Sequence, residues 1–446
     1  MGRAEHTSSE HARRPSGAPV RVGLLGCGVV GAAVARVLLE QGPALEERAG
    51  APVELAAVVV RDVGNERGVA IPQELLSLDA HAVVADPSVD IVVEVMGGLE
   101  PAGSLILDAI RHKKHVVTAN KELLANSGSE LMAAADDAGV DLLFEASVAG
   151  GIPVVRPLKE SLAGDRVRRV MGILNGTTNF ILTRMSEEDE SFADALKEAD
   201  RLGYTEADPS ADLEGHDAAA KLAILSSLAY GAHVVAADVD REGITEVSLD
   251  DVRAAHDMGY EIKLVAVAEE VEGMVSARVH PAMLPKTHPL AAVRNEFNAV
   301  FLETDHAGEL MFYGRGAGGG PTASAVVGDI MEAARSVSGA FQGPAYHHYT
   351  GRAAIRSTGE AAVRYYIVLS VVDRPGVLAL VAATFAECDV SIASVRQEGF
   401  GHAAKLTLIT HIATEAQHRE TLRRLQHLDV VDRIESRMKV LGTDEV

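Results

Sequence analysis

A glycine-rich turn near the N-terminus limits the folds open to this chain. Gly26-x-Gly28-x-x-Gly31 lies between the apolar run "VRVGLLG" (20–26) and the helical pattern "VVGAAVARVLLEQ" (29–41). Between a strand and a helix, such glycines allow a tight turn and let backbone N–H groups approach a pyrophosphate, which the helix dipole favours. A close-packed corner between a strand and a helix is the alternative explanation. The motif predicts a dinucleotide site with these cofactor-binding residues: Gly26, Cys27, Gly28, Val29, Val30 and Gly31.

The region after this turn alternates β-branched runs with helical patterns up to residue 150. The runs at 53–60, 89–97 and 114–120 are rich in valine and isoleucine and read as buried strands. Apolar strands separated by helices are typical of a parallel sheet that is covered on both faces. The sequence therefore predicts an α/β fold, with a Rossmann-type doubly wound parallel sheet over residues 19–150.

The remaining residues of the chain divide into further regions. With 446 residues the chain is too long for one ordinary core. Residues 151–336 predict a mixed α+β substrate and dimerisation domain, whose last helix can return to the nucleotide domain. Residues 337–362 lack periodicity and read as a linker. Residues 363–446 have a βαββαβ order that predicts a ferredoxin-like module. The first 18 residues have no apolar segment and read as a disordered tail rather than a signal peptide.

The composition argues against several classes of protein. A formal charge of −23 disfavours nucleic acid as a partner, because phosphate binding needs a basic face. No apolar run reaches the ~18–20 residues of a membrane span, which argues against a membrane protein. Cys27 and Cys388 are the only cysteines, so a disulfide scaffold is excluded and a reducing, cytoplasmic location is expected. The histidines form no helical HxxxH pair with an acidic partner, which disfavours a zinc enzyme.

The residue after the second expected strand bears on the choice of cofactor. In NAD-binding folds an acidic residue at this point binds the ribose 2′-hydroxyl, but here Arg61 follows Val60. A guanidinium suits a 2′-phosphate, so the sequence favours NADP as the cofactor, with NAD still possible. A solvated surface arginine is the alternative.

Asp217 and Lys221 in "DLEGHDAAAKLAILSSLAY" (212–230) are the candidates for acid–base chemistry. Hydride transfer to a carbonyl requires a group that delivers a proton to the developing alkoxide. Residues four apart share one helix face, and spacing alone favours a solvated surface pair. However, Lys221 begins a nearly continuous apolar run, which predicts that its stem is buried. Burial lowers the pKa of a lysine and a neighbouring carboxylate raises it, so such an amine can give and take a proton.

Several long motifs resemble those of one enzyme family. The segments "VVTANKELLA", "FEASVAGGIPVVRPL", "GILNGTTNFILTRM", "LGYTEADPSADLEGHDAAAKLAIL" and "FYGRGAGGGPTASAVVGD" are similar to bacterial homoserine dehydrogenase, in order, over about residues 20–336. The resemblance implies the NAD(P)H-dependent reduction of L-aspartate 4-semialdehyde to L-homoserine, on the route to threonine, methionine and isoleucine. It also implies a monofunctional enzyme, since no aspartokinase-like segment precedes the motifs. Another semialdehyde or 2-oxo acid dehydrogenase and a non-catalytic NADP-binding sensor are the alternatives.

The resemblance also implies roles for individual residues. Lys221 would be the proton donor and acceptor, and Asp217 would bind the substrate hydroxyl or orient Lys221. Glu206 would take the substrate ammonium, with Gly203 contributing backbone. Lys121 would lie between nicotinamide and substrate, because a buried strand delivers it to the carboxyl edge of the sheet, where such folds bind ligands. Further cofactor contacts are implied for Thr118, Lys121 and Gly318.

"FEASVAGGIP" (144–153) is a candidate site for a monovalent cation. One carboxylate and several exposed backbone carbonyls form an oxygen cage that suits a hard cation. Similar enzymes hold sodium with the equivalents of Glu145, Val148, Gly150 and Ile152, and the cation would fix the hinge between two domains. From the residues alone, a glycine turn after a strand is the favoured explanation; the resemblance is what supports the cation, and potassium remains open.

The C-terminal segment "SVVDRPGVLALVAATFAECDVSIASVRQEG" resembles an ACT domain, an amino-acid-sensing module. Pro375 suits a first helical turn, and Gly376 would let a ligand approach the helix N-terminus. The resemblance implies threonine as a feedback effector, or pairing between subunits without a ligand. A homodimer or homotetramer is therefore expected.

Overall fold

The computed structural model describes residues 18–205, 208–339, 360, 362–399 and 403–440. The contacts divide the chain into two compact units, Met1–Ala345 and Tyr346–Val446, which we call the N-terminal and C-terminal units. The expected tail, most of the expected linker and Glu206 lie outside the described residues.

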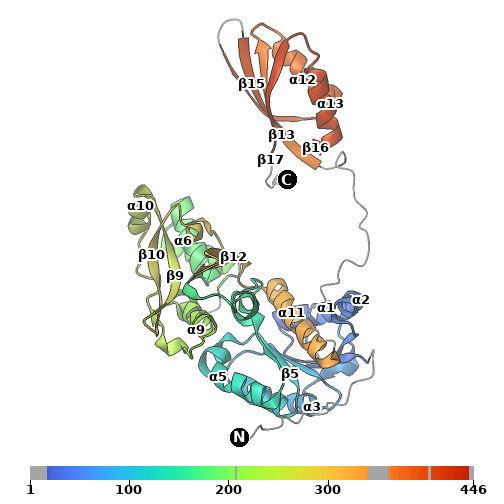
Figure 1. Ribbon diagram of the computed structural model, residues 1–446, viewed down its shortest axis with the longest axis vertical. Coiled ribbons are helices and arrows are strands. Elements are labelled where there is room, and N and C mark those ends of the chain that lie inside the picture. Colours follow the sequence, from blue (N-terminus) through green and yellow to red (C-terminus); the bar gives the residue numbers. More distant parts are fainter. Residues whose placement is uncertain (1–17, 206–207, 340–359, 361, 400–402, 441–446) are drawn as a thin grey trace, which may run out of the picture. The chain divides into compact units, whose positions relative to one another are not determined.

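The N-terminal unit begins with a six-stranded parallel sheet (Figure 1). Its order is β3-β2-β1-β4-β5-β6, so the direction of winding reverses between β1 and β4, the point where open α/β sheets bind ligands. The predicted Rossmann-type fold is confirmed. The strands are β1 (Val20–Leu25), β2 (Val53–Val59), β3 (Leu76–Ser77), β4 (Ile91–Glu94), β5 (His115–Thr118) and β6 (Leu142–Leu143).

Helices cover both faces of this sheet, and one of them returns from far along the chain. α11 (Gly319–Ser338) packs beside α1, and its apolar residues share one core with the strand residues Val22 and Leu24 (Figure 1). α5 begins at Lys121, because the Asn120 side chain caps the helix by accepting the Leu123 N–H. The other helices are α1 (Val29–Glu40), α2 (Gly42–Ala49), α3 (Ala80–Ala85), α4 (Ala102–Arg111) and α5 (Lys121–Ala138).

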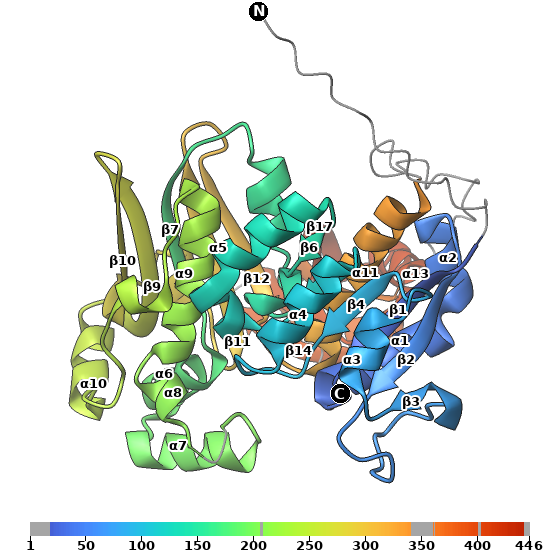
Figure 2. The same cartoon turned by 90° about the horizontal axis from the view of Figure 1, so that it is seen from below.

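The same unit contains a second, mixed sheet in the order β12-β11-β7-β9-β10-β8. α9 (His216–Tyr230) packs on this sheet and also contacts α5 of the nucleotide-binding part (Figure 2). The strands are β7 (Val167–Ile173), β8 (Asp240–Arg241), β9 (Tyr260–Val271), β10 (Met274–Pro285), β11 (Phe297–Thr304) and β12 (Glu309–Arg315). The other helices are α6 (Gly176–Glu188), α7 (Phe192–Arg201), α8 (Ser210–Leu213) and α10 (Leu249–Asp257). The contact between α5 and α9 determines where catalytic side chains can meet.

The C-terminal unit has the predicted ferredoxin-like order of elements. Its antiparallel sheet runs β14-β15-β13-β17, with β16 pairing the start of β13. The core joins Ile367 and Leu369 of β13 to Phe385 and Leu422 of the two helices. The elements are β13 (Ala362–Val372), α12 (Val377–Glu387), β14 (Ile392–Glu398), β15 (Ala403–Thr410), β16 (Ala413–Thr414), α13 (Glu415–Leu425) and β17 (Val431–Val440).

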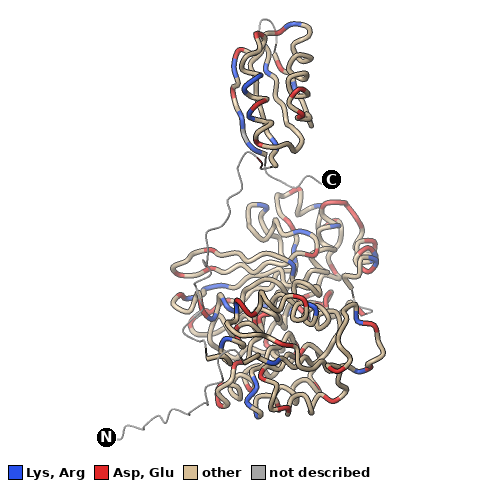
Figure 3. The backbone as a smooth tube through the Cα atoms, turned by 90° about the vertical axis from the view of Figure 1, so that its right-hand side faces the viewer, with Lys and Arg blue, Asp and Glu red and all other residues tan. Residues whose placement is uncertain are grey.

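Charged residues are interspersed over both units (Figure 3). Within the described ranges, no group of three or more His, Cys, Asp or Glu side chains could hold a metal ion. No helix in the part of the chain that the structure describes is long and apolar enough to span a membrane.

Candidate active site

The side chain of Lys221 is buried inside the N-terminal unit. α9 is apolar around almost its whole circumference, so most of its side chains are buried. Lys221 and Asp217 are buried together with Leu222 and Leu225. The Nζ of Lys221 lies 2.7 Å from the carbonyl oxygen of Leu174 and 2.7 Å from Oδ2 of Asp217. The pair is therefore internal, which rules out a solvated surface pair.

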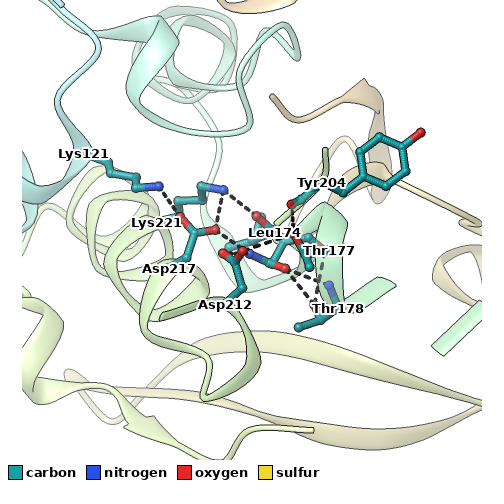
Figure 4. A network of polar contacts seen from close by, with 9 residues as sticks. Lys121, Leu174, Thr177, Thr178, Tyr204, Asp212, Asp217 and Lys221 are labelled. Carbon is teal, nitrogen blue, oxygen red and sulfur yellow. Dashed lines mark hydrogen bonds and ion pairs between the residues drawn. The ribbon is translucent and has the colours of Figure 1, made fainter. Parts of the chain in front are cut away.

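Asp217 connects two lysines from different parts of the unit (Figure 4). Its Oδ2 accepts a hydrogen bond from Lys221, and its Oδ1 accepts one from Nζ of Lys121, the first residue of α5. Lys121 follows β5 at the carboxyl edge of the parallel sheet. The contact between α5 and α9 thus places the predicted proton donor beside the edge where a dinucleotide is expected to bind.

Asn175 holds the carboxylates in place. Its Nδ2 donates to Oδ1 of Asp212 at 2.7 Å and to Oδ2 of Asp217 at 2.9 Å, while its Oδ1 caps α6 by accepting the Thr178 N–H. Thr177 lies 3.1 Å from the second oxygen of Asp212. The sequence analysis did not identify Asn175, although an asparagine ahead of "GTTNF" is a helix N-cap signal that points to it.

Two ammonium groups share the carboxylate of Asp217, and the surrounding charges set the protonation of the site. Burial alone would raise the pKa of Asp217, but Lys221 and Lys121 outweigh burial and hold that pKa well below its usual range. For Lys221, burial lowers the pKa, Asp217 opposes this effect, and the positive charge of Lys121 reinforces it. Burial and the charge of Lys121 therefore make Lys221 lose its proton more readily than an ordinary lysine does.

The ammonium of Lys221 keeps capacity for one more partner. An ammonium has three N–H donors, and Leu174 and Asp217 use two of them among the described residues. The third can reach an oxygen of a bound substrate. Asp217, by contrast, already accepts hydrogen bonds from three donors, so its position supports the role of orienting Lys221.

The nucleotide turn has the local geometry that its glycines predict. Gly26 has φ of +100°, and a Cβ at Gly31 would lie 2.2 Å from the carbonyl oxygen of Gly26. Gly28 differs, because its φ is −80° and a Cβ there would have nothing within 4 Å. Neither the backbone nor a neighbour requires glycine at position 28. Open space at the N-terminus of α1, which has no side-chain cap, fits a ligand that needs close approach to the backbone.

The other predicted cofactor residues differ in their position and in their exposure. Gly318 has φ of +112° and is the N-cap of α11, and the next residue packs so closely on Val29 that a Cβ at Gly319 would lie 2.8 Å from Cγ1 of Val29. Arg61 is exposed just beyond β2. Cys27 and Val30 are partly buried beside the turn.

Thr118 is directed inward rather than at an open site. Its hydroxyl donates to Oε2 of Glu94 at 2.7 Å and accepts the Asn120 N–H at 3.0 Å. Oε1 of the fully buried Glu94 accepts the N–H groups of Met96 and Gly97. Glu94 therefore shapes the carboxyl edge of β4 and β5. The sequence analysis missed it, although an acid in the apolar run "DIVVEV" was a signal.

The expected cation residues form a buried turn. Both oxygens of Glu145 face backbone N–H groups, those of Val154 at 2.7 Å, Val155 at 2.8 Å and Arg156 at 2.9 Å. The carbonyl oxygens of the other three residues accept no hydrogen bond from any described residue; these are Val148, Gly150 and Ile152. Buried carbonyl groups without a hydrogen bond are rare, so each of these oxygens keeps acceptor capacity for a ligand.

The substrate loop is described only in part. Gly203 has φ of +76° at the end of α7, and the next residue, Tyr204, accepts a hydrogen bond from Thr177 through its carbonyl oxygen. This contact ties the start of the loop to the cluster around Asp212.

Two family models match the chain. The model "Homoserine dehydrogenase, NAD binding domain" matches residues 26–145, and the model "Homoserine dehydrogenase" matches residues 153–331. The homoserine dehydrogenase of Mycobacterium tuberculosis is 51% identical over 95% of this chain and 98% of its own length. That of Corynebacterium glutamicum is 48% identical over 94% of this chain and 95% of its own.

Solved structures agree with these matches. A homoserine dehydrogenase from Thiobacillus denitrificans is 39% identical, with a TM-score of 0.70 over 95% of this chain and 98% of its own. A hyperthermophilic archaeal homoserine dehydrogenase in complex with NADPH is 30% identical, with a TM-score of 0.61 over 71% of this chain and 98% of its own. With nearly full-length identity to relatives and a lysine–carboxylate cluster at the nucleotide-binding edge, the chain belongs to the homoserine dehydrogenase family of NAD(P)-dependent oxidoreductases.

Proposed function

We propose that this chain catalyses the reversible reduction of L-aspartate 4-semialdehyde to L-homoserine with NAD(P)H. One observation carries the proposal: Asp217 holds the buried amine of Lys221 and the edge lysine Lys121 together. A proton donor and the expected cofactor edge thereby meet at one place, as carbonyl reduction requires.

In the reductive direction, the ammonium of Lys221 donates its proton to the carbonyl oxygen as this oxygen becomes an alkoxide. In the oxidative direction, the neutral amine of Lys221 removes the proton from the hydroxyl of homoserine. Reduced nicotinamide supplies the hydride when it is bound. Asp217 holds the amine in position, and the charge of Lys121 makes proton loss from Lys221 easier. Glu206 and Gly203 would hold the substrate ammonium.

A spectrophotometric assay tests the reaction itself. The purified chain is incubated with L-homoserine and NADP⁺ or NAD⁺ at alkaline pH, and we expect the absorbance of the reduced cofactor to rise. D-homoserine serves as the matched control, since it presents its ammonium differently. If both cofactors give flat traces with L-homoserine, the chain is a nucleotide-binding sensor and not a dehydrogenase.

NADP is the cofactor we expect the chain to prefer, with Arg61 binding its 2′-phosphate. The exposure of Arg61 just past β2 supports this assignment. Arg61→Ala should lower the ratio of kcat/KM for NADPH over NADH by about tenfold, since a charge-assisted hydrogen bond contributes roughly 1.5–3 kcal/mol and exposure reduces it. Arg111→Ala, at the exposed end of α4, should leave the ratio unchanged. An unchanged ratio in Arg61→Ala would place phosphate recognition elsewhere.

Sodium is the cation we propose for the turn built by Glu145, Val148, Gly150 and Ile152. The three carbonyl oxygens without hydrogen bonds support this proposal. Exchanging NaCl for choline chloride at constant ionic strength should lower the melting temperature, because a ligand bound only to the native state stabilises it. A KCl series decides between the two alkali cations. Equal melting temperatures in all three salts would contradict the proposal.

Threonine is the effector we propose for the C-terminal unit, as its ACT-like sequence implies. Gly376 is the N-cap of α12 and gives the helix no side-chain cap, and a Cβ there would have nothing within 4 Å. L-threonine should therefore inhibit the homoserine assay and D-threonine should not; equal rates with both would refute this role. Pairing of such units would give a homodimer or homotetramer, which light scattering measures.

A further inference from the structure

A cavity of about 530 Å³ lies between α13 and the edge strand β17 of the C-terminal unit. Its lining comes from three elements: Glu415, Arg419 and Leu422 from α13, Tyr365 from β13, and Arg437 and Lys439 from β17. The volume falls in the range of small-molecule sites, roughly 300–1,000 Å³. The cavity lies at the start of β13, whereas Gly376 follows the other end of that strand.

The lining is unusual for a contact between a helix and a sheet. Glu415, Arg419 and Leu422 recur at i, i+4 and i+7, so they share the face of α13 that turns toward β17. Elsewhere in this unit apolar side chains such as Phe385 close the gap between helix and sheet. Here charged side chains line the space between α13 and β17 and leave it open. Hydrophobic packing of the helix on the sheet does not explain these charged residues.

The floor of the cavity is a fixed, buried carboxylate. Glu415 is 4% exposed, and its oxygens lie 3.1 and 3.2 Å from the hydroxyl of Tyr365, 3.1 Å from Nε of Arg419 and 3.3 Å from Nζ of Lys439. Burial would raise the pKa of Glu415, but the hydrogen bonds from Arg419, Lys439 and Tyr365 lower it, so the carboxylate is ionised. Because these donors already surround Glu415, it orients two cations and has little capacity for a ligand ammonium.

The cavity lining carries more positive charge than the carboxylate of Glu415 neutralises. The side chain of Arg437 makes no ion pair or hydrogen bond with any residue in the described ranges, and it faces the same space as the two cations that Glu415 orients. Three cations against one carboxylate leave a local charge of +2, in a chain whose formal charge is −23. Guanidinium groups match the planar, two-oxygen geometry of carboxylate and phosphate groups.

We propose that this cavity binds a small molecule with carboxylate or phosphate groups, with Arg437, Lys439 and Arg419 as its cationic contacts and Leu422 and Tyr365 against its carbon skeleton. The C-terminal unit alone forms this site, which differs from the α12 N-terminus and does not depend on the reaction proposed above.

Calorimetric titration of the full chain with inorganic phosphate and with malonate tests the proposal. Chloride at matched ionic strength supplies the baseline, and we expect saturable binding of at least one probe. Arg437→Gln should weaken that binding about tenfold or more without changing the melting temperature of the unliganded chain, because no described contact is lost. Arg433→Gln is the matched control on the same strand, since Arg433 pairs with Asp432 and Glu435 outside the cavity. We expect it to bind as tightly as the unaltered chain.

Chemical protection locates the ligand without any substitution. Lys439 and Lys405 have equally exposed side chains, 51% each, and each pairs with one glutamate. The bound probe should slow amine acylation of Lys439 and leave Lys405 unaffected, as measured by mass spectrometry. If phosphate and malonate protect Lys439 to different extents, the difference identifies the chemical class of the ligand. Absence of binding by both probes, binding that survives Arg437→Gln, or equal protection of the two lysines would overturn the proposal.

Discussion

Lys221→Met is expected to lower kcat for homoserine oxidation by roughly 10²–10⁴-fold, the usual contribution of a positioned acid–base group. Methionine retains the apolar stem and removes only the amine that contacts Leu174 and Asp217. Nucleotide binding should persist, because Lys221 lies on α9 and the glycine turn precedes α1. Steady-state kinetics and cofactor titration together measure both effects.

Lys263→Met is the matched control for this experiment. Lys263 is also buried in the N-terminal unit, where its Nζ contacts Asn179 and the carbonyl oxygen of Val293, and burial lowers its pKa to about 8. We expect Lys263→Met to change the melting temperature and to leave kcat nearly intact. If both variants lost activity in proportion to stability, Lys221 would be a structural lysine only.

The pH dependence of the same assay follows from the pKa of Lys221, which lies below its ordinary value mainly because of burial. Oxidation needs the neutral amine, so kcat/KM for homoserine should rise as pH increases through that pKa. Reduction needs the ammonium, so its rate should fall over the same interval. Both inflections should disappear in Lys221→Met.

Gly28→Ala is expected to weaken NADP⁺ binding and to leave the melting temperature of the unliganded chain unchanged. A Cβ at this position meets nothing in the protein, and the φ of −80° suits any residue. A methyl group forced against a bound pyrophosphate costs about 1–3 kcal/mol, which corresponds to roughly 5- to 150-fold in Kd. Fluorescence titration of the reduced cofactor measures the change.

Gly31→Ala provides the contrast, because its Cβ would lie 2.2 Å from a backbone oxygen of Gly26. We expect this variant to lose both stability and affinity, since α1 must move away from the turn. Unaltered affinity in Gly28→Ala would mean that the cofactor does not approach the N-terminus of α1 as the motif predicts.

The sequence predicts those features of the site that depend on local pattern. The glycine turn is local, and so is the burial of Lys221, which begins the apolar run "KLAILSSLAY". The parallel sheet follows from strands that are apolar throughout, because only a sheet covered on both faces buries them.

The contacts that complete the site depend on tertiary packing. Lys121 and Asp217 are 96 residues apart, and they meet only because α5 packs on α9. The periodicity of a sequence shows which face of a helix is apolar. It does not show which other apolar face that helix packs against, because all such faces have similar patterns. The sequence allows the last helix of residues 151–336 to return to the nucleotide domain, and α11 packs there beside α1, but the surface with which it pairs depends on tertiary packing. Asn175 was missed because capping residues are common, and its second task of bridging two carboxylates is visible only in three dimensions.

Because of the ion pair between Lys121 and Asp217, the pKa of the Lys221 amine depends on how the two halves of the N-terminal unit pack together. Lys121 belongs to the nucleotide-binding half and Asp217 to the substrate-binding half. If the halves moved apart, Lys221 would be the only ammonium group beside Asp217, and the pKa of Lys221 would rise. Returning Lys121 to Asp217 would bring its positive charge back beside the amine and lower the pKa of Lys221 again.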